Sequence, residues 1–152
     1  MRIVIQRVTN ACIDIEGTPS GSIGRGFVVL FGVSQTDTKE IADKMLKKLV
    51  GLRIFDDEAG KTNLALADVG GEIMFVSQFT LYADCRKGNR PSFTSAGAPA
   101  MAEELYDYAV ERLRNEYAFR SLVTGSFGAH MSISLTNDGP FTVVLDSDEI
   151  VK

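Results

Sequence analysis

The feature that most constrains the fold is an uninterrupted apolar run early in the chain, Phe27–Val33. The run has the length of a β-strand and shows no alternation of apolar with polar side chains. A strand of this kind is buried on both faces, because an exposed face would carry polar residues. We therefore expect a sheet that is covered on both sides, with this run as a central strand.

Shorter apolar or alternating segments predict the remaining strands. Residues 11–16 alternate apolar with polar side chains, as expected for a half-buried strand. We expect two opening strands, a turn over residues 17–21, and several later strands. The predicted strands are residues 2–8, 11–16, 53–55, 73–81, 120–124, 130–136 and 141–146.

Two segments have the spacing of amphipathic helices. In residues 38–52 apolar side chains recur every four positions from Ile41 to Leu49, and Thr36 or Asp37 can cap the start. The second helix is expected to open at Pro99 and run to about Glu116, with its inward face formed by Leu105, Tyr108, Ala109 and Leu113. Helices interspersed with strands over 152 residues predict one mixed α/β domain, residues 1–152.

Composition narrows the classes of function. The formal net charge of −4 argues against a protein that coats nucleic acid without selectivity. Charge follows Met1 too soon for a secretory signal peptide, and no apolar run is long enough to span a bilayer. We expect a soluble cytoplasmic protein with no membrane partner.

Cysteine and histidine limit the chemistry further. Cys12 and Cys85 lack the spacing of metal ligands, so no metal is expected. Cys85 stands beside Arg86, which could lower the pKa of a nucleophilic thiol, but no histidine base accompanies it in sequence. His130 is the single histidine, and no nucleophile elbow or phosphate-binding glycine motif is present, so neither a serine triad nor a nucleotide cofactor is expected.

Polar side chains gather where the predicted strand 73–81 loses its apolar character. They are Ser77, Gln78 and Thr80, with Phe79 between them. Amide, hydroxyl and free backbone N–H groups at a strand end can bind a developing oxyanion or a substrate carbonyl. The alternative is a strand that carries ordinary polar residues on its outer face.

A second candidate segment is Gly139-Pro140, between two apolar runs near the end of the chain. Asp138 and this pair can form a simple tight turn. Alternatively, the pair can hold two carbonyl oxygens rigidly toward a pocket, because proline restricts the backbone and permits a cis peptide bond. The residues alone leave both readings open.

Basic residues form two local clusters. Lys44, Lys47 and Lys48 share the first predicted helix, where a solvated polar face is the alternative reading. Arg86 and Lys87, followed by Arg90, lie in the loop after the polar strand end. Either cluster could contact phosphates, and we favour the loop because it is close in sequence to the candidate site.

Several strings of the sequence carry a resemblance that covers nearly the whole chain. In these strings, and in their order, the chain closely resembles the D-aminoacyl-tRNA deacylase family. The strings are Met1–Val8, Gly24–Gly26, Ser77–Leu81, Lys87–Phe93, Gly125–Met131 and Asn137–Thr142. Phe141 is bulkier than the valine often found there in the family, which affects packing rather than function.

The resemblance implies a three-layer β/β/α fold and a hydrolase. Its substrate would be the ester of a D-amino acid, or of glycine, with the 3′ adenosine of tRNA. Gly139-Pro140 would be a cis pair that enters the site of the partner subunit in a homodimer and excludes L side chains by steric clash. Arg7 would hold this pair through hydrogen bonds to backbone carbonyls.

For such a reaction we expect the following roles within the site. Backbone N–H groups around Phe79 and Thr80 would form the oxyanion hole, with Ser77 and Gln78 ordering the loop. Phe127 and Met131 would line the adenosine pocket, unless they are core residues. No cofactor is implied.

Three readings of the chemistry stay open. The 2′-hydroxyl of the terminal adenosine can activate the attack. A general esterase would instead use Thr80 or Cys85 as its nucleophile. A nucleic-acid-binding module would bind without catalysis.

Overall fold

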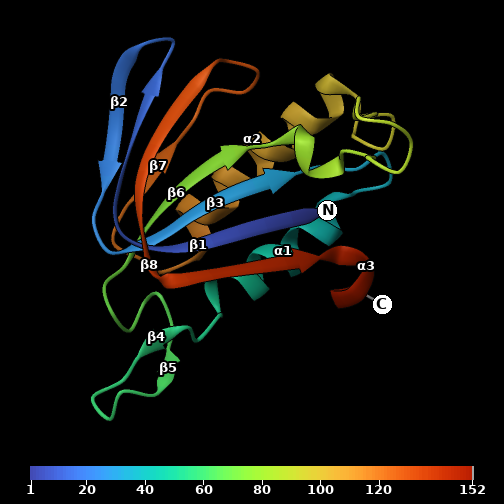
Figure 1. Ribbon diagram of the computed structural model, residues 1–152. Coiled ribbons are helices and arrows are strands. Elements are labelled where there is room, and N and C mark those ends of the chain that lie inside the picture. Colours follow the sequence, from blue (N-terminus) through green and yellow to red (C-terminus); the bar gives the residue numbers. More distant parts are fainter. Residues whose placement is uncertain (152) are drawn as a thin grey trace.

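The computed structural model describes residues 1–151, which form a mixed six-stranded sheet and a small hairpin (Figure 1). The strand order is β2-β1-β3-β6-β7, and β8 pairs with β1. The pairs between β1 and β2, β3 or β8 are antiparallel, whereas β3, β6 and β7 are parallel. The strands are β1 (Arg2–Ile15), β2 (Thr18–Ile23), β3 (Gly26–Gly32), β6 (Glu72–Ser77), β7 (Leu122–Thr124) and β8 (Met131–Asp146), and the hairpin is β4 (Phe55–Asp56) with β5 (Thr62–Leu64).

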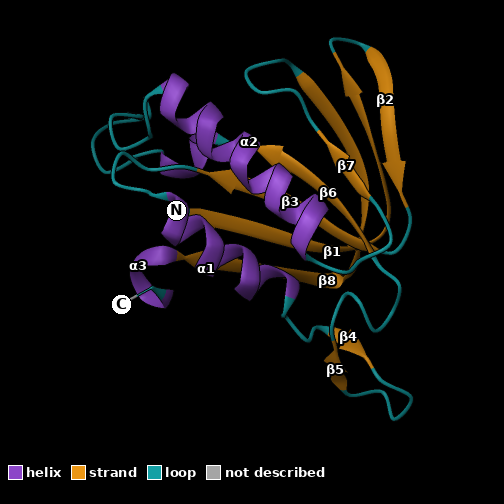
Figure 2. Cartoon of the chain, turned by 180° about the vertical axis from the view of Figure 1, so that it is seen from behind, coloured by secondary structure: helices purple, strands orange, loops and turns teal. Residues whose placement is uncertain are grey.

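Two helices cover one face of the sheet, as the view from behind shows (Figure 2). They are α1 (Lys39–Val50) and α2 (Pro99–Glu116), and two short helices are η1 (Phe79–Tyr82) and α3 (Ser147–Ile150). The larger core lies between these helices and the sheet. Phe27, Phe31 and Phe75 extend into it from the strands, and all three are essentially inaccessible to solvent.

A second core lies on the other face of β3 and β6. Val28 and Met74 contribute to it from these central strands, and Ala11 and Ile13 from the far half of β1. The sheet curls so that its outer strands fold back over the central ones, as Figure 1 shows for β2, β7 and β8. The outer part of the curled sheet, its central part and the helices are therefore stacked in three layers. The predicted mixed α/β fold of type β/β/α is confirmed.

The central-strand prediction is confirmed by β3, which lies between β1 and β6 and has one core on each side. The second helix begins and ends where predicted, at Pro99 and Glu116. Its inward face differs at one position, because Tyr106 is buried and Tyr108 is only half-buried. The first helix is capped by Thr38, whose hydroxyl accepts from the N–H of Ile41, and not by the residues predicted to cap it, Thr36 and Asp37.

Several predicted strand boundaries are wrong, because pairing continues through segments that look like breaks in sequence. The two predicted opening strands are one strand, β1, which bends where its register with β8 shifts. The predicted turn over residues 17–21 is restricted to Glu16 and Gly17. Residues 130–136 and 141–146 are likewise one strand, β8, and residues 53–55 contribute only the start of β4.

The predicted strand over residues 73–81 is too long. Pairing of β6 with β3 ends at Ser77, and residues Phe79–Tyr82 turn into η1. No helix of residues 1–151 is long and apolar enough to cross a membrane.

Candidate functional site

A cavity of about 290 Å³ opens where β6 ends and β8 begins. It contains five of the residues that the sequence nominated, namely Ser77, Gln78, Phe79, Phe127 and Met131. The other residues that line it are Val76, Gly128, Ala129, His130 and Ile133. The structure thus joins two segments that are about fifty residues apart in the chain.

The strand end forms one wall of this cavity. The N–H of Gln78 still donates to the carbonyl of Phe31 at 2.8 Å, so the chain leaves the sheet only after this residue. The N–H groups of Phe79 and Thr80 then start η1, and neither donates to an acceptor within residues 1–151. Free donors are expected at the first residues of a helix, and Phe79, which carries one of them, lines the cavity.

Thr80 lies beside the cavity, but its side chain is exposed and is not part of the lining. The amide Nε2 of Gln78 donates to the Thr80 hydroxyl Oγ1 at 2.6 Å. Among the hydrogen bonds of the described chain, this hydroxyl contacts neither a carboxylate nor an imidazole. Thr80 therefore lacks a general base in this structure.

The connection between β7 and β8 forms the opposite wall. Met131 packs so close to Gly125 that a Cβ at this glycine would lie 2.4 Å from the Met131 sulfur. The ring of Phe127 lies 6.2 Å from that of Tyr106, which ties the wall to α2. The Tyr106 hydroxyl donates to the carbonyl of Phe75 at 2.8 Å, and burial raises the pKa of Tyr106 to about 12.

Gly139-Pro140 is a cis pair and is exposed at the bend of β8. The side chain of Asn137 accepts from the N–H of Phe141 at 2.7 Å, which closes the backbone around the pair. Gly139 has a φ of +136°, a conformation that other residues rarely adopt. The pair therefore lies at an exposed bend within β8, and we call these two residues the Gly-Pro tip.

Arg7, on the neighbouring strand β1, contacts this segment. Its guanidinium donates to the carbonyls of Asp138 at 3.0 Å and Ile54 at 2.7 Å. It also lies 4.6 Å from the centre of the Phe141 ring, and Arg7 is only 7% exposed. The hydrogen bond to Asp138 places Arg7 against the residue that precedes the Gly-Pro pair.

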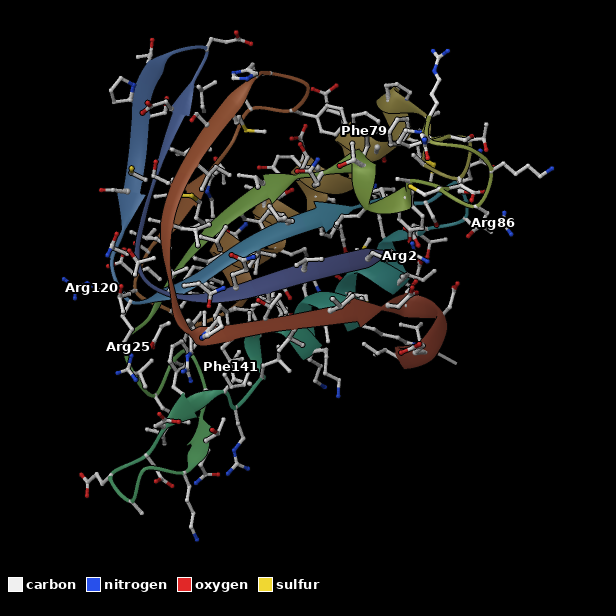
Figure 3. All side chains as sticks on the ribbon, viewed as in Figure 1. Arg2, Arg25, Phe79, Arg86, Arg120 and Phe141 are labelled. Atoms are coloured by element: carbon white, nitrogen blue, oxygen red, sulfur yellow. The ribbon has the colours of Figure 1, made fainter. Side chains whose placement is uncertain are left out.

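The Gly-Pro tip and the cavity lie at opposite ends of the central strands. Arg7 pairs with Phe27 and Phe27 with Ile73, near the start of β6, whereas the cavity is lined by the last two residues of β6, Val76 and Ser77. A strand of six residues spans about 16 Å. Figure 3 shows the same separation, with Phe79 at one end of the sheet and Phe141 at the other. Within one chain, the tip does not reach the cavity.

Comparison with known proteins identifies the family. The family model described as D-Tyr-tRNA(Tyr) deacylase matches residues 4–146, which is nearly the whole chain. The chain belongs to this deacylase family.

Relatives of similar length support the assignment. The D-aminoacyl-tRNA deacylase of Thermosipho melanesiensis is 49% identical over 99% of this chain and 99% of its own. The D-aminoacyl-tRNA deacylase of Lactobacillus acidophilus is 52% identical over 96% of this chain and 99% of its own.

Two solved structures resemble the fold. One, titled c-Myc DNA Unwinding Element Binding Protein, has a TM-score of 0.90 and 41% identity, and covers 96% of this chain and 98% of its own. Another, titled as a probable eukaryotic D-amino acid tRNA deacylase, has a TM-score of 0.80, covers 95% of this chain and 97% of its own, and at 17% identity supports the fold alone.

Sequence reasoning missed several contributors to this deacylase-family site. Asn137 accepts from the N–H of Phe141 next to the Gly-Pro pair, and the carbonyl of Ile54 accepts from Arg7. His130 is exposed and lines the cavity. The resemblance already included the strings that contain Asn137 and His130, but Ile54 contributes a backbone carbonyl, for which no sequence signal exists. Cys85 is exposed and lies outside the cavity. Residues 1–151 contain no cluster of three side chains suited to hold a metal.

Proposed function

We propose that this protein hydrolyses the ester of D-aminoacyl-tRNA, and of glycyl-tRNA, to free amino acid and tRNA in the cytoplasm. Family membership and the names of its relatives support the substrate class. The observation that carries the proposal is the cavity that joins the Ser77–Phe79 strand end to the Phe127–Met131 wall. The single domain predicted for residues 1–152 would hold one such site in each subunit.

The terminal adenosine is proposed to enter between the two walls of the cavity. Phe127 offers an aromatic ring and Met131 a polarizable thioether, and both suit a nucleobase. The volume of about 290 Å³ is at the small end for a ligand pocket. The site would therefore hold one nucleoside and the reacting ester, with the amino acid side chain extending toward solvent.

The free N–H groups of Phe79 and Thr80 are proposed to bind the oxyanion of the tetrahedral intermediate. Both belong to the start of η1, and neither has an acceptor in the described chain. Preorganised donors of this kind lower the barrier of acyl transfer by about 3 to 4 kcal/mol each. Ser77 and Gln78 would order the loop, as the hydrogen bond from Gln78 to Thr80 illustrates.

The 2′-hydroxyl of the substrate adenosine is proposed to activate the attack on the ester. The Thr80 hydroxyl accepts a hydrogen bond from the Gln78 amide and contacts no general base among residues 1–151, which disfavours it as the nucleophile. We expect a Thr80→Ala variant to retain the activity on D-aminoacyl-tRNA. Activity that disappears in Thr80→Ala while the fold persists would instead favour the general esterase.

The Gly139-Pro140 tip is proposed to enter the cavity of a second subunit in a homodimer. The tip is exposed and lies at the far end of the sheet from its own cavity. Its carbonyls would accept hydrogen bonds from the α-amino group of the substrate. An L side chain would then meet the tip, so selectivity would arise by exclusion and not by recognition of the D side chain.

Hydrolysis of D-tyrosyl-, L-tyrosyl- and glycyl-tRNA, measured side by side, tests the proposed activity. We expect the D-tyrosyl and glycyl esters to be cleaved and the L-tyrosyl ester to be spared. Cleavage of both tyrosyl esters would indicate a general esterase. Binding of tRNA without cleavage would indicate the nucleic-acid-binding module, the reading that matches the name of the structural relative c-Myc DNA Unwinding Element Binding Protein.

Mixing two inactive variants tests the composite site. One variant would carry a tip changed by Pro140→Ala, which displaces the carbonyls proposed to bind the α-amino group, and the other a cavity blocked by Ala129→Trp. If each site uses the tip of the other subunit, a mixed dimer regains one intact site, and an equal mixture recovers about a quarter of the wild-type activity. No recovery, with mixed dimers demonstrated by differential tags, would refute the exchange of tips between subunits.

A further inference from the structure

We infer that an exposed aromatic pair, Phe79 with Phe93, and the basic residues Lys87 and Arg90 bind the single-stranded nucleotides that precede the terminal adenosine of the tRNA substrate. This inference rests on the proposed function, because it names the next part of the same substrate. Phe79 lines the cavity, so the pair marks its mouth.

The aromatic pair has open ring surface. Phe79 is 56% exposed and Phe93 is 38% exposed, which is unusual for large apolar side chains. Their ring centres lie 5.0 Å apart with an angle of 67° between the planes. Because both rings keep exposed surface after this contact, a base can stack on the pair without separating the two rings.

The loop that carries Phe93 is held in place before any ligand binds. Asp84 and Ser92 exchange two backbone hydrogen bonds, of 2.7 and 2.9 Å. The N–H of Ala96 donates to the carbonyl of Phe93 at 3.1 Å, and the side chain of Gln35 donates to the carbonyl of Thr94. A platform that is already ordered loses little conformational entropy on binding.

Basic side chains extend from the same loop. Arg86 is paired with Asp84 at 2.7 Å, and this pair holds the pKa of the Asp84 carboxyl down at about 2. Lys87 and Arg90 are exposed, and within residues 1–151 neither forms an ion pair. They line a hollow of about 500 Å³ with Asp84, Arg86 and Ser92. Figure 3 shows Phe79 and Arg86 on the same side of the molecule.

Stacking rings beside unpaired cations are the combination that binds single-stranded nucleic acid. The rings accept any base, and the cations neutralise the phosphates. The chain as a whole has a net charge of −4, so this positive loop is a local feature beside the cavity. The 3′ end of the tRNA is single-stranded, and its penultimate nucleotide lies next to the adenosine in the cavity. That nucleotide is the occupant we assign to the rings.

A series of D-aminoacyl esters of increasing length tests the assignment. The esters are those of adenosine, of the dinucleotide CA, of the trinucleotide CCA and of complete tRNA. For the unaltered protein, we expect kcat/KM to rise about tenfold from adenosine to CA, because base stacking on an aromatic ring contributes an effect of this order. Phe93→Leu should lose most of this rise, and Phe93→Tyr, which keeps the ring, should preserve it.

The basic residues are tested on complete tRNA as a function of salt. The double variant Lys87→Ala with Arg90→Ala should reduce the salt dependence of kcat/KM by about one to two released counterions. The matched control is Lys47→Ala with Lys48→Ala, which removes the same charge from exposed positions on α1. We expect the control to leave the salt dependence unchanged.

The outcomes separate this inference from the proposed function. If the adenosine ester is cleaved but the CA ester has no higher kcat/KM, the aromatic assignment is wrong while the deacylase function stands. If Phe93→Leu and Phe93→Tyr lower kcat/KM equally for the CA ester and the adenosine ester, Phe93 stabilises the fold and does not bind the nucleotide. If none of the D-aminoacyl esters is cleaved, the proposed function itself fails.

Discussion

Replacement of Arg7 is expected to destabilise the protein and to displace the Gly-Pro tip. Arg7 is buried and donates to the carbonyls of Asp138 and Ile54. A hydrogen bond from a charged group contributes about 1.5 to 3 kcal/mol, and the contact with the Phe141 ring adds about 0.5 to 1 kcal/mol. Asp138 is partly exposed, so water can bind its carbonyl when Arg7 is removed, which offsets some of the loss in stability.

For Arg7→Met we therefore expect the free energy of unfolding to fall by about 3 kcal/mol, within the range for a broken buried charge interaction. Methionine keeps the apolar stem but removes both donors. Arg7→Lys keeps the charge but lacks the planar fork that reaches two carbonyls, so about half of the loss is expected. The difference between the variants isolates the geometry of the guanidinium from its charge.

Urea denaturation at one fixed protein concentration measures these losses, because the stability of a dimer depends on concentration. Deacylation of D-tyrosyl-tRNA by the folded Arg7→Lys variant then reports the position of the tip. A loss below about 1 kcal/mol for Arg7→Met would refute the energetic reasoning. Full deacylation by Arg7→Lys would show that the tip does not depend on the fork.

Three further perturbations have distinct expected results. Burial raises the pKa of Tyr106 from 10.0 to about 12, so the unfolded chain loses this proton first. The contribution of Tyr106 to the free energy of unfolding should be constant below pH 10 and be lost from pH 10 to 12, so the free energy should fall less steeply over this range in Tyr106→Phe. Asp37→Asn removes the carboxylate that pairs with the buried Met1 ammonium at 2.5 Å, and chemical denaturation should show a loss of about 3 kcal/mol or more. Gly125→Ala places a Cβ 2.4 Å from the Met131 sulfur; the sulfur should shift into the cavity, raising KM for D-aminoacyl-tRNA more than it lowers the melting temperature.

Local patterns predicted the elements whose stability depends on their own residues. The apolar run Phe27–Val33 predicted β3 and its burial on both faces, because the absence of alternation is a property of the run itself. Pro99 predicted the first residue of α2, since proline fits the first turn of a helix. The family motifs nominated Ser77, Phe127 and the other residues that gather in the cavity.

The cavity also shows where sequence reasoning reached its limit. Gln78 and Phe127 were nominated separately, and nothing in the sequence pattern placed them on facing walls. The free N–H groups at Phe79 and Thr80 exist because pairing of β6 stops at Ser77, several residues earlier than the sequence predicted. The hydrogen bond from Arg7 to Ile54 involves a backbone carbonyl, which every residue carries.

The sequence by itself determined which segments are apolar enough to be buried and which residues can open a helix, because these depend on neighbours within a few positions. Only the tertiary structure decided that β1 and β8 are each continuous. Their twelve pairs run past the bulge at Val8 and the Gly-Pro bend, so hydrogen bonds between distant segments override the local signals for a break. The same long-range pairing sets the Gly-Pro tip at one end of the sheet and the cavity at the other, because register is a property of two strands together and not of either sequence alone.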